Sequence, residues 1–220
     1  MRLALEEANA PYVDVARAAG GVTAMTRIIA GKGTALAPFA PPFLVSGKLT
    51  IAQTANILAW LAPRHGLVPD DEASRVAAHQ LQLTIADLFV EAHDVHHPLG
   101  PSLYYEDQRP ESRRRSAAFI AERLPKYLGY FERTLTRGGG KHPVKRRFTY
   151  VDLSLFQVMS GLSYAFPNVM RKHTRKFPLL RALHDRVAAR PRIAAYLASA
   201  RRVPFNESGI FRHYPELDRP

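Results

Sequence analysis

The sequence changes character between residues 64 and 72. Before this stretch, helix and strand patterns alternate, whereas after residue 69 every regular pattern has the periodicity of a helix. A chain of 220 residues is long enough for two modest domains that each bury a core. The order of the patterns therefore predicts a mixed α/β N-terminal domain over residues 1–65 and an all-α domain over residues 72–202.

The N-terminal part contains one sharply defined motif, in which a proline-rich loop leads into a hairpin and then a helix. Strands are predicted over 43–45 and 48–51, because Ser46-Gly47 between them suits a tight two-residue turn. A helix is predicted from Gln53 to Pro63. The weaker patterns upstream predict a helix over 1–8, a strand over 12–16 and a short helix over 23–29.

Helical patterns fill the chain from residue 72 to about residue 200. They predict helices over 72–97, 111–136, 148–164, 177–190 and 191–200. The final segment, residues 203–220, is irregular and carries several large apolar side chains, which is unusual for a free chain end. We therefore expect this tail to fold back over the helical domain.

Composition excludes several classes of protein. The sequence contains no Cys, which excludes disulfides and thiolate metal sites within it. No apolar run reaches the length of a membrane span, and the first residues lack the layout of a signal peptide, so we expect a cytoplasmic protein with no membrane contact. The net charge is +12, but aromatic residues do not alternate with the basic clusters as a stacking platform requires, so nucleic-acid binding is not expected.

Two features beside the hairpin have the chemistry of a binding site. A cis X-Pro bond within Pro41-Pro42-Phe43 would turn the edge backbone outward and leave its polar groups free to pair with an extended peptide. An ordinary proline-rich loop is the alternative. At Gln53-Thr54, a helix N-terminus offers unpaired N–H groups and partial positive charge, which suit a carboxylate. Thr54 could equally serve as a helix cap.

Two further features lie in the helical part. Thr149 and Asp152 have the spacing of a capping box, and Phe148 and Leu153 fit the matching hydrophobic staple. This motif predicts a helix start with a structural role and no chemistry of its own. Asp87 interrupts an otherwise apolar helix face, where it either lies at the edge of the buried stripe or meets the ammonium group of a ligand at a subunit interface.

These features together resemble one family. The order Pro42-Phe43-Leu44, Gly47 and then the block from Leu49 to Leu58 is similar to a block of the soluble glutathione transferases, and the Thr149–Asp152 box is the other recurring mark of that family. The resemblance implies a thioredoxin-like N-terminal domain, an all-helical C-terminal domain and assembly as a homodimer.

The resemblance also implies roles for single residues. Pro42 would be the cis-proline, and the backbone at Pro41, next to Phe43, would pair with the cysteinyl part of glutathione. Gln53 and Thr54 would hold the γ-glutamyl end, and Asp87 would reach the ligand of the opposite subunit. The family's fold begins with a strand that leads to the hydroxyl or thiol residue activating the bound thiol. Residues 1–5 already match the first helix, so we expect that strand and residue upstream of Met1, and the catalytic residue is unknown.

A cluster at the end of the helix over 72–97 is open to several interpretations. His93, His96 and His97 follow i, i+3, i+4 spacing, and Tyr104 and Tyr105 come shortly after them. In transferases of this type this region lies near the electrophile pocket, so we expect His93, His97, Tyr104 and Tyr105 to line the second-substrate site. Ordinary packing is an alternative. A metal site is not expected, because the sequence shows no further ligand and a helix C-terminus favours His for its dipole alone.

The function that follows from the resemblance is conjugation of the glutathione thiolate to a small hydrophobic electrophile. We expect glutathione to act as the co-substrate, and we expect no metal cofactor. The alternative is a non-catalytic glutathione-binding or dimerisation module, since one fold serves many functions.

Overall fold

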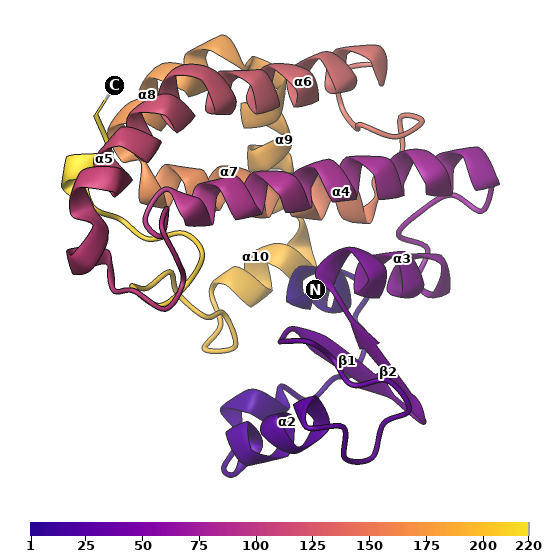
Figure 1. The fold of residues 1–220 in the computed structure, drawn as a ribbon. Helices are drawn as coiled ribbons and strands as arrows, with labels where there is room; N and C mark the ends of the chain where they lie inside the picture. The colour runs from indigo at the N-terminus through magenta and orange to yellow at the C-terminus, as the bar shows by residue number, and fades with distance from the viewer. Residues whose placement is uncertain (220) are drawn as a thin grey trace.

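The computed structural model describes residues 1–219 and has the predicted fold class, a small thioredoxin-like α/β part followed by a helical bundle (Figure 1). The first part consists of α1 (Arg2–Glu7), α2 (Gly21–Ile29), β1 (Phe43–Ser46), β2 (Leu49–Ala52) and α3 (Thr54–Arg64). The bundle consists of α4 (Glu72–Asp94), α5 (Arg109–Ala118), α6 (Leu124–Arg137), α7 (Tyr150–Ala165), α8 (Pro167–Lys176), α9 (Pro178–Ala188) and α10 (Pro191–Leu197).

The hairpin forms where the sequence predicts it. β1 and β2 pair antiparallel, with Phe43 opposite Ala52 and Ser46 opposite Leu49. Gly47 closes the turn at φ +58°, a backbone conformation that glycine adopts at little cost. The peptide bond between Pro41 and Pro42, just before β1, is cis, as the family resemblance implies.

α3 covers the hairpin and joins it to the rest of the molecule. Ile57 and Leu61 of α3 pack with Ile51 of β2 and Leu5 of α1 in one small apolar cluster. The neighbouring residues Leu58 and Ala62 belong instead to the large apolar cluster of the bundle. α3 therefore buries two faces at once and fixes the hairpin relative to the bundle.

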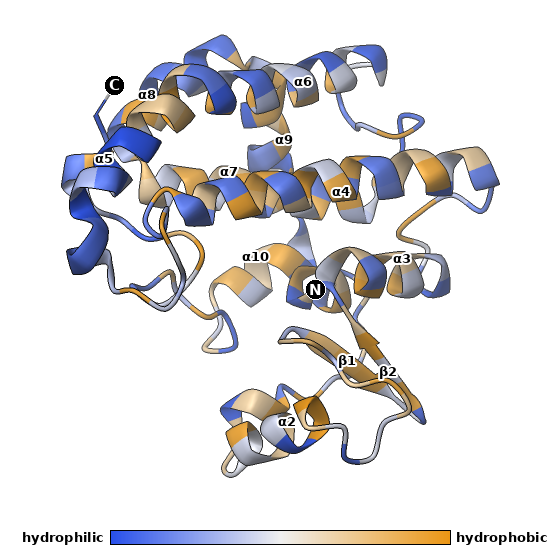
Figure 2. Cartoon of the chain, in the orientation of Figure 1, coloured by the Kyte–Doolittle hydropathy of each residue, from blue (hydrophilic) through white to orange (hydrophobic). Residues whose placement is uncertain are grey.

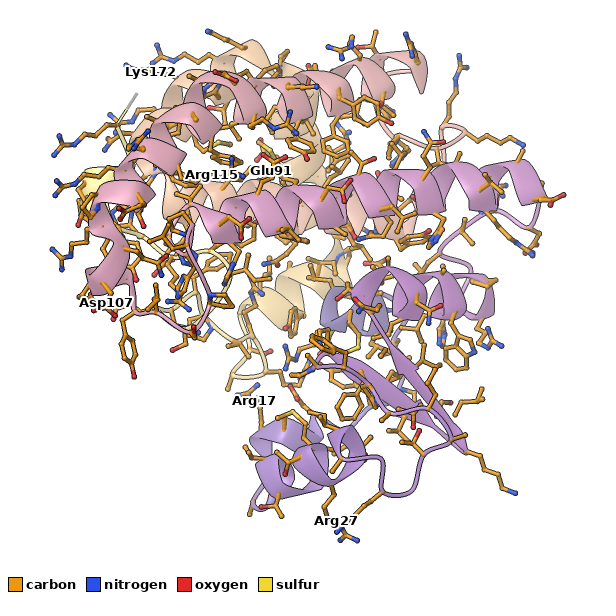
Figure 3. The ribbon with its side chains drawn as sticks, in the orientation of Figure 1. Arg17, Arg27, Glu91, Asp107, Arg115 and Lys172 are labelled. Atoms are coloured by element: carbon orange, nitrogen blue, oxygen red, sulfur yellow. The ribbon has the colours of Figure 1, made fainter. Side chains whose placement is uncertain are left out.

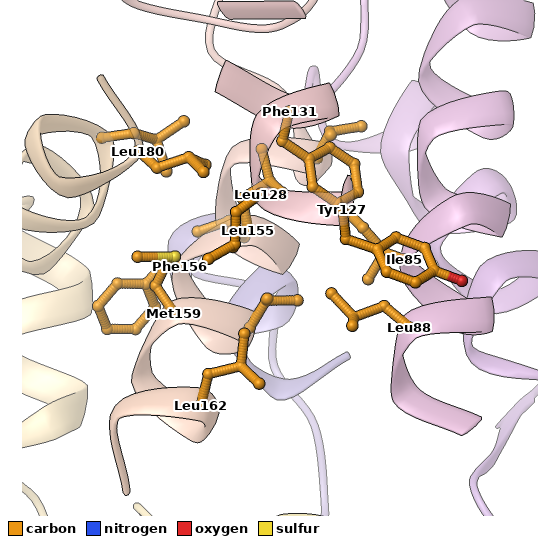
Figure 4. Close-up of a cluster of buried hydrophobic side chains, with 14 of the residues drawn as sticks. Ile85, Leu88, Tyr127, Leu128, Phe131, Leu155, Phe156, Met159, Leu162 and Leu180 are labelled. Atoms are coloured by element: carbon orange, nitrogen blue, oxygen red, sulfur yellow. The ribbon is translucent and has the colours of Figure 1, made fainter. Parts of the chain in front are cut away.

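α7 is the central helix of the bundle and is buried over most of its surface. Leu153, Phe156, Met159 and Leu162 are each at most 2% exposed, and the helix packs against α4, α8, α9 and α1. Figure 4 shows its side chains meeting those of α4 and α6 in a single apolar cluster. By contrast, α5 lies at the periphery and is largely hydrophilic (Figure 2). The less buried positions of α7 include Ser154, Gln157, Ser160 and Ser163, which recur every three residues and form one narrow polar stripe on an otherwise apolar helix.

The start of α7 carries the predicted capping box. Asp152 accepts a hydrogen bond from the backbone N–H of Thr149 at 2.8 Å, and the hydroxyl of Thr149 accepts one from the N–H of Val151 at 3.3 Å. Thr149 and Asp152 are 0% and 1% exposed, so these bonds satisfy polar groups that water does not reach. His142 Nδ1 lies 2.8 Å from the other carboxylate oxygen of Asp152.

The chain after residue 203 packs against the bundle. Phe211 and Leu217 are buried in its apolar cluster, and Ser116 donates a hydrogen bond to the carbonyl of Leu217 at 2.6 Å. Asp218 accepts hydrogen bonds from the backbone N–H groups of Asn168 at 2.8 Å and Val169 at 3.0 Å. The carboxylate thus caps the N-terminus of α8, a favourable place for negative charge.

Three sequence-based expectations about elements need correction. The strand predicted over 12–16 does not form: residues Val15–Arg17 make one turn of 3₁₀-helix, and Val13 is 80% exposed. Alternation alone does not make a strand, since a strand needs a hydrogen-bonded neighbour and β1–β2 is the only sheet within residues 1–219. The helix predicted over 111–136 is a longer run, 109–137, interrupted by the π-helical segment η3 (Phe119–Arg123). α8 was not predicted.

A half-buried acid ties α4 to this π-helical segment. Glu91 on α4 accepts two hydrogen bonds from Arg123, at 2.6 and 2.9 Å, and one from the hydroxyl of Tyr127 at 2.8 Å. Arg115 lies 3.7 Å from the same carboxylate (Figure 3). The hydrogen bonds from Arg123 hold the pKa of Glu91 below its usual value, against the opposing effect of burial.

None of the helices within residues 1–219 is long and apolar enough to cross a membrane.

We expect Gly161→Ala to destabilise the fold. A Cβ at Gly161 would lie 2.3 Å from the ring of Phe211, so the tail must shift away from α7. Overpacking of this kind costs about 1–3 kcal/mol. Gly129→Ala on α6 is the matched control, because its Cβ would meet the flexible end of Arg133 at 3.2 Å and the ring of Phe177 at an ordinary contact distance of 3.8 Å. The gain in helix propensity, about 1 kcal/mol, should make that variant neutral or more stable. Urea denaturation compares the two, and equal stabilities would contradict the packing of Phe211 on α7.

We expect Glu91→Gln to change how stability depends on pH. The pKa of Glu91 is lower in the folded chain than in the unfolded chain, so its stabilising effect is present above its unfolded pKa. The effect disappears as the pH falls through the folded pKa. At pH 7 the variant should be less stable than the wild type by about 1–3 kcal/mol, because charged hydrogen bonds are lost. The difference should shrink between about pH 5 and pH 3, in denaturation curves recorded across that range. A constant difference would show that the charge of Glu91 contributes nothing.

Candidate functional site

One cavity of the described residues lies where the hairpin and α3 meet the bundle. Its volume is about 370 Å³, and its lining comes from α1, the residue before β1, α3, α4, α7, α10 and the tail. Several segments that are distant in sequence converge there, which is the usual setting of a binding site. The cavity has one polar end and one apolar wall.

The first turn of α3 forms the polar end. Thr54, the first residue of that helix, lines the cavity together with Pro42. No side chain within residues 1–219 caps this N-terminus. Its first-turn N–H groups and the positive end of the helix dipole are therefore available to an anion in the cavity.

Gln53, the residue before this helix, has an unusual backbone. Its φ of +67° lies in the region that non-glycine residues rarely adopt. Such a conformation costs on the order of 1 kcal/mol and persists only where the surrounding structure imposes it. The carbonyl of Gln53 accepts a hydrogen bond from Ile57 at 2.9 Å, which starts the helix. The kink thus turns the chain sharply from β2 into α3 beside Pro42.

The bundle contributes a buried polar pair to the cavity. Gln82 on α4 is 1% exposed and accepts a hydrogen bond from the hydroxyl of Ser154 on α7 at 2.6 Å. Both residues line the cavity, as does Gln157 one turn further along α7. They are not among the residues predicted from the sequence. The available signal is that Gln82 lies on the apolar stripe of α4, between Ala78 and Ile85, where a polar side chain needs a partner.

Aromatic side chains form the apolar wall. Phe89 of α4 packs edge-on against Phe211 of the tail at 5.4 Å between ring centroids. Phe205 stacks on Tyr164 of α7 at 4.9 Å. Phe89, Phe205 and Phe211 all line the cavity. This wall offers a flat aromatic surface to an apolar group, whereas the α3 end offers N–H donors to a charged one.

The residues predicted around the hairpin divide into two sets. Pro42 and Thr54 line the cavity. Pro41, Phe43 and Gln53 are their immediate chain neighbours and do not line it. Asp87 also lies outside the cavity, on the solvent-exposed side of α4.

The four residues expected to line a second-substrate pocket, His93, His97, Tyr104 and Tyr105, all lie outside the cavity. The tail explains why. Ile210 lines the cavity, and its carbonyl lies 2.8 Å from Nε2 of His96, so the tail separates the histidines from the cavity.

Neither tyrosine faces the cavity: Tyr104 faces solvent, and Tyr105 packs against the tail. Tyr104 is 78% exposed. Tyr105 is buried, its ring stacks on Tyr214 at 3.8 Å, and its hydroxyl donates a hydrogen bond to Glu216 at 2.9 Å. Burial and the neighbouring carboxylate raise the pKa of Tyr105, so this hydroxyl stays protonated at neutral pH.

The three histidines at the end of α4 gather into one compact group. The ring centroids of His93, His96 and His97 lie 4.7 to 5.1 Å apart. Burial lowers the pKa of His96 to about 4 and lowers that of His97 as well. Both rings are therefore neutral at pH 7. The residues that pack on them come from the tail rather than from the cavity, namely Ile210, Arg212 and Tyr214.

Comparisons with known proteins agree with this architecture. Residues 93–200 match the family model described as the C-terminal domain of glutathione S-transferase. Glutathione S-transferase 2 of Onchocerca volvulus is 30% identical over 175 residues, which cover 76% of this chain and 75% of that protein. A glutathione S-transferase of Plasmodium yoelii yoelii is 25% identical over 158 residues, 72% of this chain and 67% of that protein.

The solved structures are similar in fold. The Pi-class glutathione S-transferase of Onchocerca volvulus aligns with a TM-score of 0.66 and 24% identity, covering 89% of this chain and 84% of that one. A prostaglandin synthase D of Nilaparvata lugens aligns with a TM-score of 0.65 and 18% identity, covering 92% of both chains.

Proposed function

Because the chain belongs to the glutathione S-transferase family, we propose that it binds glutathione in the cavity and conjugates the thiolate to a small hydrophobic electrophile. The main observation that supports this proposal is that the uncapped N-terminus of α3 and Pro42, the residue before β1, line the same cavity. On this proposal, residues 1–65 form the glutathione-binding domain and residues 72–202 the helical domain, with residues 203–220 as a tail over it.

Glutathione suits the polar end because it is an extended, γ-linked tripeptide with a carboxylate at each end. Its γ-glutamyl carboxylate would bind at the first turn of α3, between the hydroxyl of Thr54 and the free N–H groups. The backbone beside the cis peptide, at Pro41 and Phe43, would pair with the cysteinyl part in the manner of an added strand. Gln53 would contribute through the backbone kink that aims this helix end.

On this proposal, the thiolate of bound glutathione lies between the polar end of the cavity at α3 and its aromatic wall. The sulfur attacks an electrophilic carbon, a C–S bond forms, and a leaving group departs with its electron pair or a π bond shifts its electrons onto the substituent that activates it. A free thiol is mostly protonated at pH 7, so a site that favours the anion raises the fraction that reacts. The protein also holds both partners in reach of each other. The aromatic wall of Phe89, Phe205 and Phe211 would hold the electrophile.

We further propose that the protein is a homodimer that pairs through α4. Val76, Leu83 and Val90 are 60%, 48% and 60% exposed, and they recur every seven residues on one side of this helix. Asp87, four residues after Leu83, falls on the same stripe and is exposed. In a symmetric pair, an acid on this stripe would face the other subunit and could meet the ammonium group of its glutathione.

A cytoplasmic location is consistent with the absence of Cys.

We expect Thr54→Ala to weaken glutathione binding. Loss of one hydrogen bond to a carboxylate costs about 1.5–3 kcal/mol, which raises Kd about 10- to 150-fold. Thr134→Ala is the matched control, since that hydroxyl donates to the carbonyl of Tyr130 on α6 and does not line the cavity. Calorimetry gives both values. No heat from the folded wild type at millimolar glutathione would refute the proposed function, and binding without turnover of an electrophile would leave a non-catalytic binding module.

We expect Leu83→Glu to produce monomers. A carboxylate in the middle of the α4 stripe would be buried against its symmetry mate in the dimer, and burial of unpaired like charges is unfavourable. Leu103→Glu is the control, because Leu103 is also exposed, at 40%, but lies in the loop after α4. Sedimentation equilibrium should show a dimer for the wild type and this control. A dimeric Leu83→Glu variant would place the interface elsewhere.

A further inference from the structure

The structure assigns a second, separate site to the histidine cluster: we infer that His93, His96 and His97 bind one divalent transition-metal ion of the type that prefers imidazole, such as Zn²⁺. One ring nitrogen from each histidine lies within 4.8 Å of the corresponding atoms of the other two. The site does not depend on the proposed transferase function, because none of the three lines the glutathione cavity.

The end of α4 brings the three ligands together. His93 lies in the last turn of α4, whereas His96 and His97 follow the end of the helix, where the turn brings their rings within 4.7 to 5.1 Å of one another and of His93. The rings of His93 and His97 lie nearly parallel, with centroids 5.0 Å apart and an interplanar angle of 21°. His96 approaches from the side, and its Nδ1 lies 2.5 Å from Nδ1 of His97.

The tail fixes the tautomer of the central ligand. Nε2 of His96 lies 2.8 Å from the carbonyl oxygen of Ile210. A carbonyl can only accept, so Nε2 of His96 carries the proton and donates it. In the neutral ring, Nδ1 then presents its lone pair to the cluster. A metal-bound histidine characteristically donates its second ring nitrogen to a carbonyl or carboxylate in this way. Asp94 Oδ1, 3.5 Å from Nδ1 of His93, is placed to do the same for that ligand.

Metal binding replaces the contact between the two Nδ1 atoms. Because Nδ1 of His96 has no proton, Nδ1 of His97 donates in that contact, and His97 must move its proton to Nε2 before its Nδ1 can bind the ion. Three imidazole nitrogens bound to one tetrahedral ion lie roughly 3.3 Å apart, given metal–nitrogen distances of about 2.0–2.1 Å. The His96–His97 pair would open slightly, and His93, whose side chain is 31% exposed, is free to swing inward. Water would complete the coordination, so no fourth protein ligand is required. The negative end of the α4 dipole favours a cation at this place, whereas Arg212 opposes it.

Zinc titration of the tag-free, chelator-treated protein tests the site. We expect calorimetry to show one Zn²⁺ per chain and thermal melts to show a higher Tm with the metal. His93→Asn should weaken binding at least about tenfold and remove the Tm shift. His65→Asn, at an exposed histidine near the end of α3, should leave both unchanged. Co²⁺ should give the absorption bands of nitrogen ligation in the wild type and lose them in His93→Asn. Mg²⁺, which prefers oxygen ligands, should not bind.

His93→Asn is the primary variant because His93 is half-buried and its loss leaves the fold intact, unlike replacement of the buried His96. His97→Gln provides a second ligand loss. The proposal is overturned if the wild type binds no Zn²⁺ at 100 µM, or if it binds several ions per chain that both ligand variants retain. Glutathione affinity of these metal-free variants should match the wild type, which separates failure at this site from failure of the transferase proposal.

Discussion

The near-complete burial of α7 is the constraint on which the rest of the structure depends. Because the first turn of this helix is buried, its polar backbone groups must be satisfied within the protein, and the Thr149–Asp152 box does so. One side of α7 contacts α4 and places Ser154 against Gln82. Another side has Gly161, whose missing side chain leaves room for Phe211. The same helix therefore holds the bundle together, supplies polar groups to the cavity and receives the tail.

Local signals in the sequence predict the parts of this fold that local chemistry determines. The Ser46-Gly47 turn and the Thr149–Asp152 box are each set by a few adjacent residues, and the structure contains both. The cis peptide at Pro42 follows from the family resemblance rather than from the adjacent residues alone. The strand over 12–16 fails because pairing depends on a distant neighbour that periodicity does not reveal. Tyr105 and the histidines are excluded from the cavity by a tail more than 100 residues later, which no local pattern reports.

The division of the cavity into a polar end and an aromatic wall matches what thiol transfer requires. A charged tripeptide needs N–H donors and positive potential, which the uncapped α3 provides beside Thr54. An apolar electrophile needs an apolar surface against which it can leave water, and Phe89, Phe205 and Phe211 provide one. These two requirements are met by different parts of the chain. On the proposed function, changes in the tail would alter the electrophile that is accepted while the glutathione end stays the same.

The tail also connects the histidine cluster to the aromatic wall. The carbonyl of Ile210 bonds to His96, while the side chains of Ile210 and Phe211 line the cavity. An ion held by the histidines would restrict the ring of His96 and, through that hydrogen bond, the position of the tail. A ligand against the aromatic wall restricts the same segment from its other side. Because thermodynamic coupling is reciprocal, each would then change the affinity of the other by the same factor. Two sites that share no ligand atom are thus linked by a single hydrogen-bonded backbone segment.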